Sequence, residues 1–272
     1  MEYFTVTHLS DRVLRIRDPF GSICTLVIGS ERALLVDTGI GFGNIGEAVK
    51  LFTDKPVTAM NTHEHLDHSM GSRFFNRCFM HENCRRYLEI RNTEPYRRRV
   101  ISLYMPHGPV PGFSEEKYFG YDYANIDWFS GELRFDLGDL NAVTVPLPSH
   151  TPGSAGVLFP ELRLLLTGDS IAPLTSLLFE ESLSPQAHAE VLEQVKKLDF
   201  DTMLCAHSER AMPKSYLDVF LRFIENLDTA DSYRYRDPIY AAIPARTYIY
   251  HDDRSSEAAA FILRLDQEGN HS

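Results

Sequence analysis

The stretch "MNTHEHLDHSMG", residues 60–71, determines how this chain is interpreted. Three histidines and two acids fall within the six positions from His63 to His68. Polar, titratable side chains at this density do not help to build a hydrophobic core, and loops that join a strand to a helix are where rigid scaffolds present functional groups. Imidazole and carboxylate together suit a divalent metal such as zinc, iron or manganese. The stretch therefore predicts a metal site.

The spacing inside this motif indicates how its side chains are directed. His63 and His65 are two positions apart, so they point to the same side of an extended segment. Asp67 and His68 follow a further bend and can point to a neighbouring position. Two histidines and one acid satisfy a single ion, whereas three histidines and two acids indicate more than one ion if further ligands arrive from elsewhere. Glu64 alternates with the ligands, and we expect it to face solvent or to support a ligand.

Three later motifs supply such ligands. His150 lies in "PLPSHTPGS", Asp169 in "LLLTGDS" and His207 in "MLCAHS". Each of these side chains directly follows a short apolar run that predicts a strand. Strand ends gathered at one edge of a layered fold can converge on one site. We therefore expect His150, Asp169 and His207 to join the histidine cluster.

Strand and helix signals run along the whole chain. Four short apolar runs in the first 39 residues predict an antiparallel meander. Further strands are predicted at 57–61, 133–139, 140–150, 156–160, 162–169, 202–207 and 245–252, and helices at 45–52, 184–199, 213–228 and 255–266. Two β-rich halves with helices outside them favour a layered α/β (α+β) arrangement in one domain, residues 1–272.

Composition restricts the function further. The formal net charge is -11, which disfavours nucleic acid and anionic membrane surfaces as partners. The N-terminus lacks the basic and apolar regions of a signal peptide, and no apolar run approaches a membrane span of about 20 residues. We expect a cytoplasmic protein with reduced thiols that acts on a small-molecule substrate. A homodimer is left open.

The four motifs, in their order along the chain, resemble those of the metallo-β-lactamase superfamily of hydrolases. "THEHLDH", "PSHTPGS", "LLLTGDS" and "CAHS" carry this resemblance, together with "LLVDTG" upstream. The resemblance implies a four-layer αββα sandwich with a two-metal site at its upper edge. It implies that one ion is bound by His63, His65 and His150, that the other is bound by Asp67, His68 and His207, and that Asp169 bridges both. Asp37, in "VDTG", is expected to support the loop rather than bind metal.

This ligand set implies hydrolysis by a hydroxide held between two ions. Two divalent ions about 3.5–4 Å apart acidify a shared water and polarise a carbonyl or phosphoryl group. Zinc is the expected metal, with iron or manganese as alternatives, and Asp67 and Asp169 are the expected catalytic carboxylates. A dedicated β-lactamase is disfavoured, because those enzymes typically place Arg and Cys where this chain has His68 and Asp169.

Features that are absent from this sequence help to choose among the other branches of the superfamily. The set is similar to glyoxalase II, lactonases and tRNA-processing nucleases, but no basic substrate arm of the nuclease kind is evident. A hydrolase of an ester, lactone or thioester in the glyoxalase II/lactonase-like branch is the leading interpretation. A mono-iron sulfur dioxygenase on the same fold and a non-catalytic metal-binding sensor are the alternatives.

A long aromatic stretch separates the first motif from His150. Residues 82–131 are rich in aromatic residues and broken by prolines, and about 80 residues between two site motifs exceed a typical connection. The stretch begins shortly after one loop of expected ligands and ends shortly before the next, so it should lie beside the site. We therefore predict a helical, aromatic substrate lid. A satellite core or an oligomer interface is the alternative. His107, in its "MPHGPVPG" tip, is the candidate substrate-binding residue.

Overall fold

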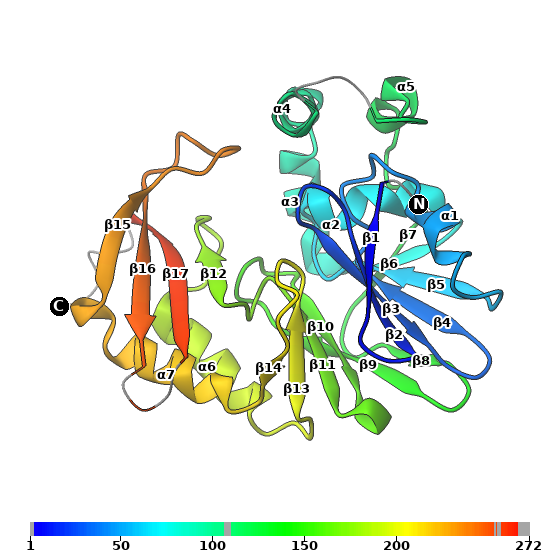
Figure 1. Cartoon of the computed structure of the whole chain (residues 1–272). Coiled ribbons are helices and arrows are strands. Elements are labelled where there is room, and N and C mark those ends of the chain that lie inside the picture. The colour runs from blue at the N-terminus through cyan, green and yellow to red at the C-terminus, as the bar shows by residue number, and fades with distance from the viewer. Residues whose placement is uncertain (1–2, 106–109, 253, 255–256, 266–272) are drawn as a thin grey trace.

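Two β-sheets face each other across the main core of the protein, and helices cover their outer sides (Figure 1). The structure is a computed structural model that describes residues 3–105, 110–252, 254 and 257–265. Among these residues, no helix has the length and apolar character needed to cross a membrane. The four-layer αββα sandwich predicted from the sequence is confirmed.

The first sheet has seven strands in chain order. The predicted meander forms its antiparallel half, and β4 to β7 run parallel to one another. Because β4 and β5 are parallel, the loops that follow them leave from the same edge of the sheet. The strands are β1 (Thr5–His8), β2 (Val13–Arg17), β3 (Ile23–Ile28), β4 (Ala33–Val36), β5 (Val57–Met60), β6 (Cys78–His81) and β7 (Ile126–Phe129).

The second sheet has six strands in the order β14-β13-β11-β10-β9-β8. Only β11 and β13 pair in parallel, which brings the turns after them to one edge. The strands are β8 (Arg134–Asp136), β9 (Asn141–Pro146), β10 (Ala155–Phe159), β11 (Leu164–Gly168), β13 (Thr202–Cys205) and β14 (Met212–Pro213).

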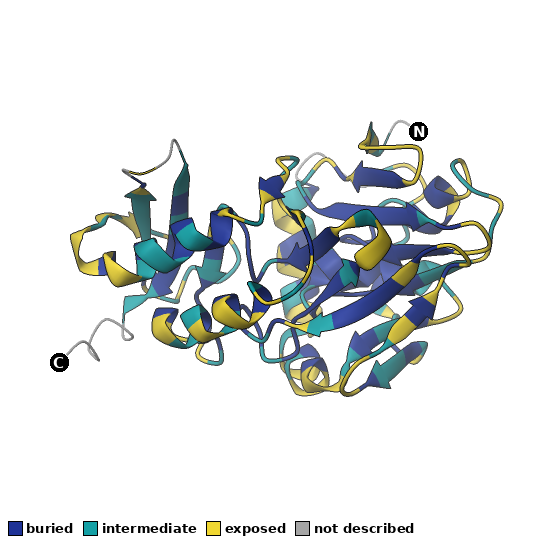
Figure 2. Ribbon diagram, turned by 90° about the horizontal axis from the view of Figure 1, so that it is seen from below, coloured by how far each residue is buried: buried dark blue, intermediate teal, exposed yellow. Residues whose placement is uncertain are grey.

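Apolar side chains from both sheets meet in one buried cluster. Val27, Leu34 and Met60 from the first sheet pack there with Val157 and Leu166 from the second. The strands of both sheets are largely buried while the outer faces of the helices are exposed, as Figure 2 shows. Burial of this core fixes the relative position of the two sheets, and with it the edge where the ligand-bearing loops meet.

Helices cover the outer face of each sheet. On the first sheet lie α1 (Ile45–Val49), α2 (Leu66–Ser69), η1 (Met70–Phe74), η2 (Glu82–Cys84), α3 (Arg85–Arg91), α4 (Glu94–Tyr104) and α5 (Glu115–Phe119). On the other side, α6 (Pro185–Val195) and α7 (Tyr216–Glu225) pack against the second sheet. The short 3-10 turns η3 (Pro160–Leu162) and η4 (Leu227–Thr229) complete the helical elements.

A third sheet lies beyond α6 and α7 and was not expected from the sequence (Figure 1). It consists of β12 (Leu174–Leu177), β17 (Ala258–Arg264), β16 (Ala245–His251) and β15 (Asp231–Tyr235) in that order. The prediction of a helix at 255–266 is therefore wrong, because residues 258–264 of that stretch form β17. An apolar run of this length fits a buried strand as well as a helix, and pairing with both β12 and β16 decides for the strand.

The aromatic stretch at 82–131 divides into two parts. The described residues from 82 to 119 contain η2, α3, α4 and α5, whereas residues 126–129 form β7, an edge strand of the first sheet. Tyr118 and Tyr123 are buried in a cluster with Leu66 and Met70, beneath the metal motif. Part of the aromatic content therefore builds core, as the alternative interpretation held. His107 lies in 106–109, outside the described residues.

Candidate metal centre

All seven predicted ligand side chains meet at one edge of the sandwich. His63 to His68 follow β5, and Asp169 and His207 follow the parallel strands β11 and β13. The turn into Asp169 requires Gly168, whose φ is +56° and whose position would bring a Cβ within 2.8 Å of Thr62 Oγ1. Local strand ends and one tight glycine turn thus position the cluster.

Three histidines form a first potential ligand group. His63 Nε2 lies 3.1 Å from His65 Nδ1, and His150 Nε2 lies 3.0 Å from the same atom. The ring nitrogens that face one another therefore converge on a small volume. Burial, together with the neighbouring histidines, lowers the pKa of His63 and of His65 well below the ordinary value. Neutral imidazoles present the lone pairs that a metal ion needs.

A second group lies beside the first and is more open to solvent. Asp67 Oδ2 is 3.4 Å from His68 Nε2 and 3.3 Å from His207 Nε2. His68 is buried, whereas the side chain of His207 is 40% exposed. Burial opposes protonation of His68 and His207, but the adjacent carboxylates raise the pKa of both rings. Carboxylates and imidazoles at these distances suit a divalent cation.

Asp169 lies between the two groups. Its Oδ2 is 3.4 Å from His68 Nε2, 3.3 Å from His207 Nε2 and 3.8 Å from His150 Nε2. Burial raises the pKa of this carboxyl group, but the imidazoles of His207 and His68 lower it well below its usual range. One carboxylate is thus within reach of ligand atoms from both groups.

The outward-facing nitrogens of three site histidines are held by other groups. Asp37 Oδ2 lies 2.9 Å from His68 Nδ1, and Thr62 Oγ1 lies 3.0 Å from His63 Nδ1. His150 Nδ1 donates to the carbonyl oxygen of Ser176 at 2.6 Å. Partners of this kind fix the tautomer and the ring orientation of metal-binding histidines. Each of these three rings therefore presents Nε2 to the cluster.

Two buried atoms test whether the residues fit metal ions. Asp169 Oδ1 and His65 Nε2 have no hydrogen-bond partner among the described residues, although each is shielded from solvent. Leaving a buried polar atom unpaired costs about 1–3 kcal/mol, so such atoms call for an explanation. A divalent ion bound by the Asp169 carboxylate would give its unpaired oxygen a partner. The donor set and this orphaned atom fit divalent ions.

A buried arginine holds the loop that carries His207. Arg15 lies on β2 and is 1% exposed, and its guanidinium donates to the carbonyl oxygens of Cys205 and Ser208, the latter at 2.9 Å. These two carbonyls flank His207 on either side. In an alternating strand, "VLRIR", such an arginine resembles an ordinary solvent-facing residue, so the sequence offered no signal for this contact.

Glu64 joins the two histidine loops. It is buried, which excludes the solvent-facing position that the sequence allowed, and Thr151 Oγ1 donates to its Oε2 at 3.0 Å. Burial raises the pKa of Glu64, and Arg91 on α3 lies 3.5 Å from its other oxygen. Arg91 also forms an ion pair with Glu181. The helical insertion is thereby attached to the metal motif through charged contacts.

Aromatic side chains border the cluster on the insertion side. The ring centroid of Phe179 is 5.0 Å from that of His65 and 4.8 Å from that of Tyr240. The Tyr240 hydroxyl donates to the hydroxyl of Tyr96 on α4 at 2.8 Å, and Arg99 donates to the carbonyl of Pro238. The insertion and the segment between β15 and β16 therefore meet beside the candidate centre.

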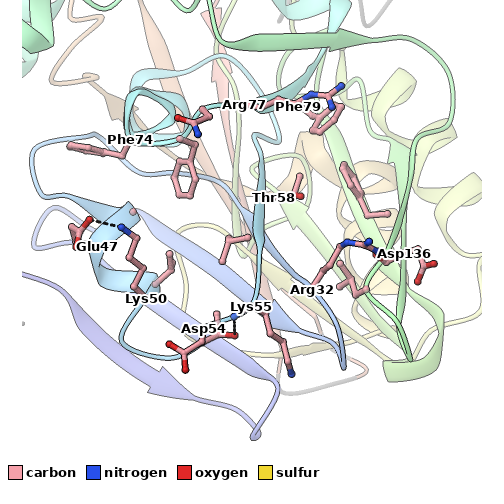
Figure 3. A pocket seen from close by; sticks show the side chains of 18 of the residues that line it. Arg32, Glu47, Lys50, Asp54, Lys55, Thr58, Phe74, Arg77, Phe79 and Asp136 are labelled. Carbon is pink, nitrogen blue, oxygen red and sulfur yellow. Dashed lines mark hydrogen bonds and ion pairs between the residues drawn. The ribbon is translucent and has the colours of Figure 1, made fainter.

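One cavity adjoins the cluster and a larger one lies elsewhere. The adjoining cavity has a volume of about 300 Å³ and is lined by both Asp169 and His207. The larger one, of about 920 Å³, lies near the first residues of β5, at the end of that strand opposite the metal motif (Figure 3). Its described lining includes none of the seven candidate ligands, and its Lys50 is already paired with Glu47. Of these two cavities, only the smaller one gives access to the cluster.

The fold and this edge site define a metallo-β-lactamase-type protein. The sequence profile of the Metallo-beta-lactamase superfamily matches residues 17–207, and the chain belongs to that superfamily. Among individual proteins, the chain is similar to the acyl-coenzyme A thioesterase MBLAC2 of Bos taurus and of Homo sapiens. Each is 24% identical over 188 residues, which cover 63% of this chain and 67% of the relative.

Solved structures share the fold at lower identity. The stereoselective inverting sec-alkylsulfatase Pisa1 from Pseudomonas sp. superimposes with a TM-score of 0.63 and 15% identity over 83% of this chain. This chain spans only 42% of that sulfatase. A metallo-beta-lactamase from Pontibacter korlensis gives a TM-score of 0.56 and 17% identity, covering 82% of this chain and 99% of that one.

Proposed function

We propose that this protein is a metal-dependent hydrolase of acyl thioesters. The observation that carries the proposal is the convergence of seven histidine and aspartate side chains into two adjoining groups with Asp169 between them. Among the ester, lactone and thioester substrates that the motifs favour, the similarity to acyl-coenzyme A thioesterases supports the thioester.

The proposed ligand sets follow the two groups. Asp169 would contribute to both, which makes it the residue on which the binuclear arrangement depends. One ion would be held by His63, His65 and His150, and the other by Asp67, His68 and His207. Zinc suits these nitrogen and oxygen donors best, and iron or manganese would also be accepted.

The residues of the chain bind and orient, while the ions supply the reactivity. When bound, two divalent ions would provide an acidified water as nucleophile and Lewis acidity toward a carbonyl oxygen. Asp67 and Asp169 would balance the charge of the ions, and the exposed His207 side would admit the substrate. The four cysteines are buried, and burial raises the pKa of Cys205, so a thiol nucleophile is not needed or favoured.

We also propose that the chain acts as one unit in which residues 82–105 and 110–125 form a wall beside the centre. The contacts Arg91–Glu64 and Tyr96–Tyr240 support this arrangement, because they join the insertion to the metal motif and to the β15–β16 segment. A wall of this kind excludes water and binds apolar groups. It would act on substrate choice rather than on metal retention.

Metal analysis combined with a substrate panel tests the proposal. Protein purified without added metal and then reconstituted with zinc should hold about two ions per chain. It should hydrolyse acyl thioesters faster than lactones, p-nitrophenyl esters or phosphodiesters, and chelation should abolish the activity. Asp228→Ala, at an exposed position, serves as a control for handling and metal loading.

Other outcomes point to the two alternatives. A metal-replete sample with a single iron and persulfide-dependent oxygen uptake would assign the chain to the sulfur dioxygenases. Two bound ions without hydrolysis of any member of the panel would favour a sensor. Either result would overturn the thioesterase proposal.

A further inference from the structure

We infer that the cavity beside Asp169 and His207 is an acyl-chain pocket, which takes the alkyl portion of a thioester substrate. The inference rests on the proposed function and adds the part of the substrate that is recognised. The cavity, of about 300 Å³, falls at the lower end of the range for small-ligand sites, about 300–1,000 Å³. That size suits an alkyl chain of moderate length.

The cavity is lined by two chemically different kinds of residue. Asp169, His207 and Ser208 are polar, and the first two belong to the candidate metal centre. The remainder is mostly apolar and includes Ala172, Pro173, Leu174 and Ile262. A ligand with a reactive carbonyl at one end and a hydrocarbon chain at the other matches this distribution, since the chain gains by leaving water.

Strand pairing explains why the wall is apolar. β12 and β17 pair in parallel, with Ser176 opposite Ile262 and Leu174 opposite Ala260. Alternate residues of a strand share a face, so these four belong to one side of the pair. On the opposite face, Ala259, Phe261 and Leu263 pack against α6 and α7. One face of the third sheet thus stabilises the fold, while the other lines the pocket.

The pocket is also tied to the candidate metal centre. The carbonyl oxygen of Ser176 accepts a hydrogen bond from His150 Nδ1 at 2.6 Å, so the strand that lines the cavity also orients a ligand. The position of the wall strand relative to the His150 ring is therefore set by a direct contact. β12 lies inside the family match at 17–207, whereas β17, which supplies Ile262, lies outside it.

Leu174 lies on the wall and reaches solvent. It is 49% exposed, and single exposed leucines are ordinary on protein surfaces. Here the exposed side chain lines a cavity that also contains two candidate ligands. A longer acyl chain would cover Leu174, which makes this residue the natural place to change chain-length preference without disturbing the core.

Acyl-coenzyme A substrates with two to twelve carbons test the inference on the zinc-loaded protein. In the wild type, kcat/KM should rise by about fourfold per added methylene until the cavity is full. Leu174→Trp should lower the octanoyl-to-acetyl ratio of kcat/KM by about tenfold or more. Leu51→Trp, at a leucine that is 63% exposed and does not line the cavity, should leave that ratio unchanged. Equal ratios in wild type and Leu174→Trp would overturn the pocket.

A binding measurement separates failure of the pocket from failure of the thioesterase proposal. If the wild type hydrolyses no acyl thioester, the proposed function falls. Calorimetric titration of the zinc-loaded protein with octanoate and acetate then decides on the pocket by itself. Tighter binding of octanoate that Leu174→Trp abolishes supports the pocket, whereas equal affinity for both acids in the wild type rules it out.

Discussion

Asp37 and His68 form a buried pair, with Asp37 Oδ2 2.9 Å from His68 Nδ1, the ring nitrogen that faces away from the cluster. Asp37 adopts a left-handed backbone conformation with a φ of 63°, which is costly for a residue with a side chain and persists where the surroundings demand it. Its other oxygen accepts the backbone N–H of Thr62 at 2.7 Å. One carboxylate therefore fixes both the start of the metal motif and its last histidine.

Replacing Asp37 should weaken metal binding without removing a proposed ligand. In Asp37→Asn, an NH2 group replaces one carboxylate oxygen and can no longer accept the hydrogen bond from His68 or Thr62. The His68 ring therefore loses its fixed orientation. Loss of such an outer partner typically costs about 10- to 100-fold in metal affinity. Competition titration of zinc against a chelator measures this change, with Asp228→Asn as the control. Unchanged affinity for both ions would contradict the orienting role.

Asp169 should be the most sensitive of the proposed ligands. Asp169→Ala removes a carboxylate from both groups, whereas Asp67→Ala and His150→Ala each remove a ligand from one. We expect Asp169→Ala to retain the least zinc and at least tenfold less activity than the other two variants. Metal content by mass spectrometry and kcat/KM measured together provide the comparison. A loss at Asp169 no greater than at His150, with metal content intact, would exclude a bridging role.

Arg15 should support the His207 side of the centre. Arg15→Met leaves the carbonyls of Cys205 and Ser208 without their charged donor, and hydrogen bonds of this kind contribute about 1.5–3 kcal/mol. We expect a lower free energy of unfolding by that amount and weaker binding of one of two zinc ions. Arg15→Lys should recover part of both effects, because it keeps a positive charge.

The exposed Arg12, on the loop before the same strand, provides the comparison for Arg15. Its side chain is 46% exposed and pairs with Asp139 at the surface, so Arg12→Met should change the free energy of unfolding by less than about 1 kcal/mol. Urea unfolding and zinc titration of the three variants give both quantities. Two ions bound with wild-type affinity in Arg15→Met would show that the loop holds His207 without the guanidinium.

The buried His188 should make stability depend on pH. Burial lowers the pKa of His188 to about 4, from an ordinary value near 6.5. Between these values the unfolded chain takes up a proton that the folded chain does not, so stability falls as the pH falls below 6.5. The loss should reach about 2 kcal/mol between pH 7.5 and pH 5.

A variant separates this contribution from that of the metal-site groups. His188→Leu cannot take up a proton. It loses the hydrogen bond with Ser149 Oγ and the ring contacts with Phe220 and Phe261, none of which involves a partner that titrates in this range. The difference in free energy of unfolding between wild type and variant should therefore shrink or reverse as the pH is lowered. Parallel pH profiles for the two proteins would mean that His188 is not held neutral.

The sequence determined much of the candidate site, because each proposed ligand lies close to the end of a predicted strand. His63, His65, Asp67 and His68 come from one contiguous motif, and the later ligands each follow an apolar run that a strand explains. Whether a side chain follows a strand is a local property, which periodicity and turn residues reveal. The convergence of these side chains was then predictable from the layered fold.

Only the tertiary structure shows that the third sheet forms and that one of its faces lines the cavity. The run "AAAFILR" has no periodicity that separates a strand from a helix, and it became β17 because β12 and β16 offer edges on both sides. The same pairing faces Ile262 toward the cavity. No local signal in residues 255–266 carries information about a partner strand more than 80 residues earlier in the chain.

Long-range contacts around the candidate centre were likewise not predictable from the sequence. Arg15 reaches a loop 190 residues away, and Ser176 orients His150 through a backbone carbonyl, a group that every residue possesses. The chain thus encodes the identities of the candidate ligand side chains locally. Their orientation, the burial that shifts their pKa values and the shape of the adjoining cavity depend on packing between distant segments, which only the folded structure defines.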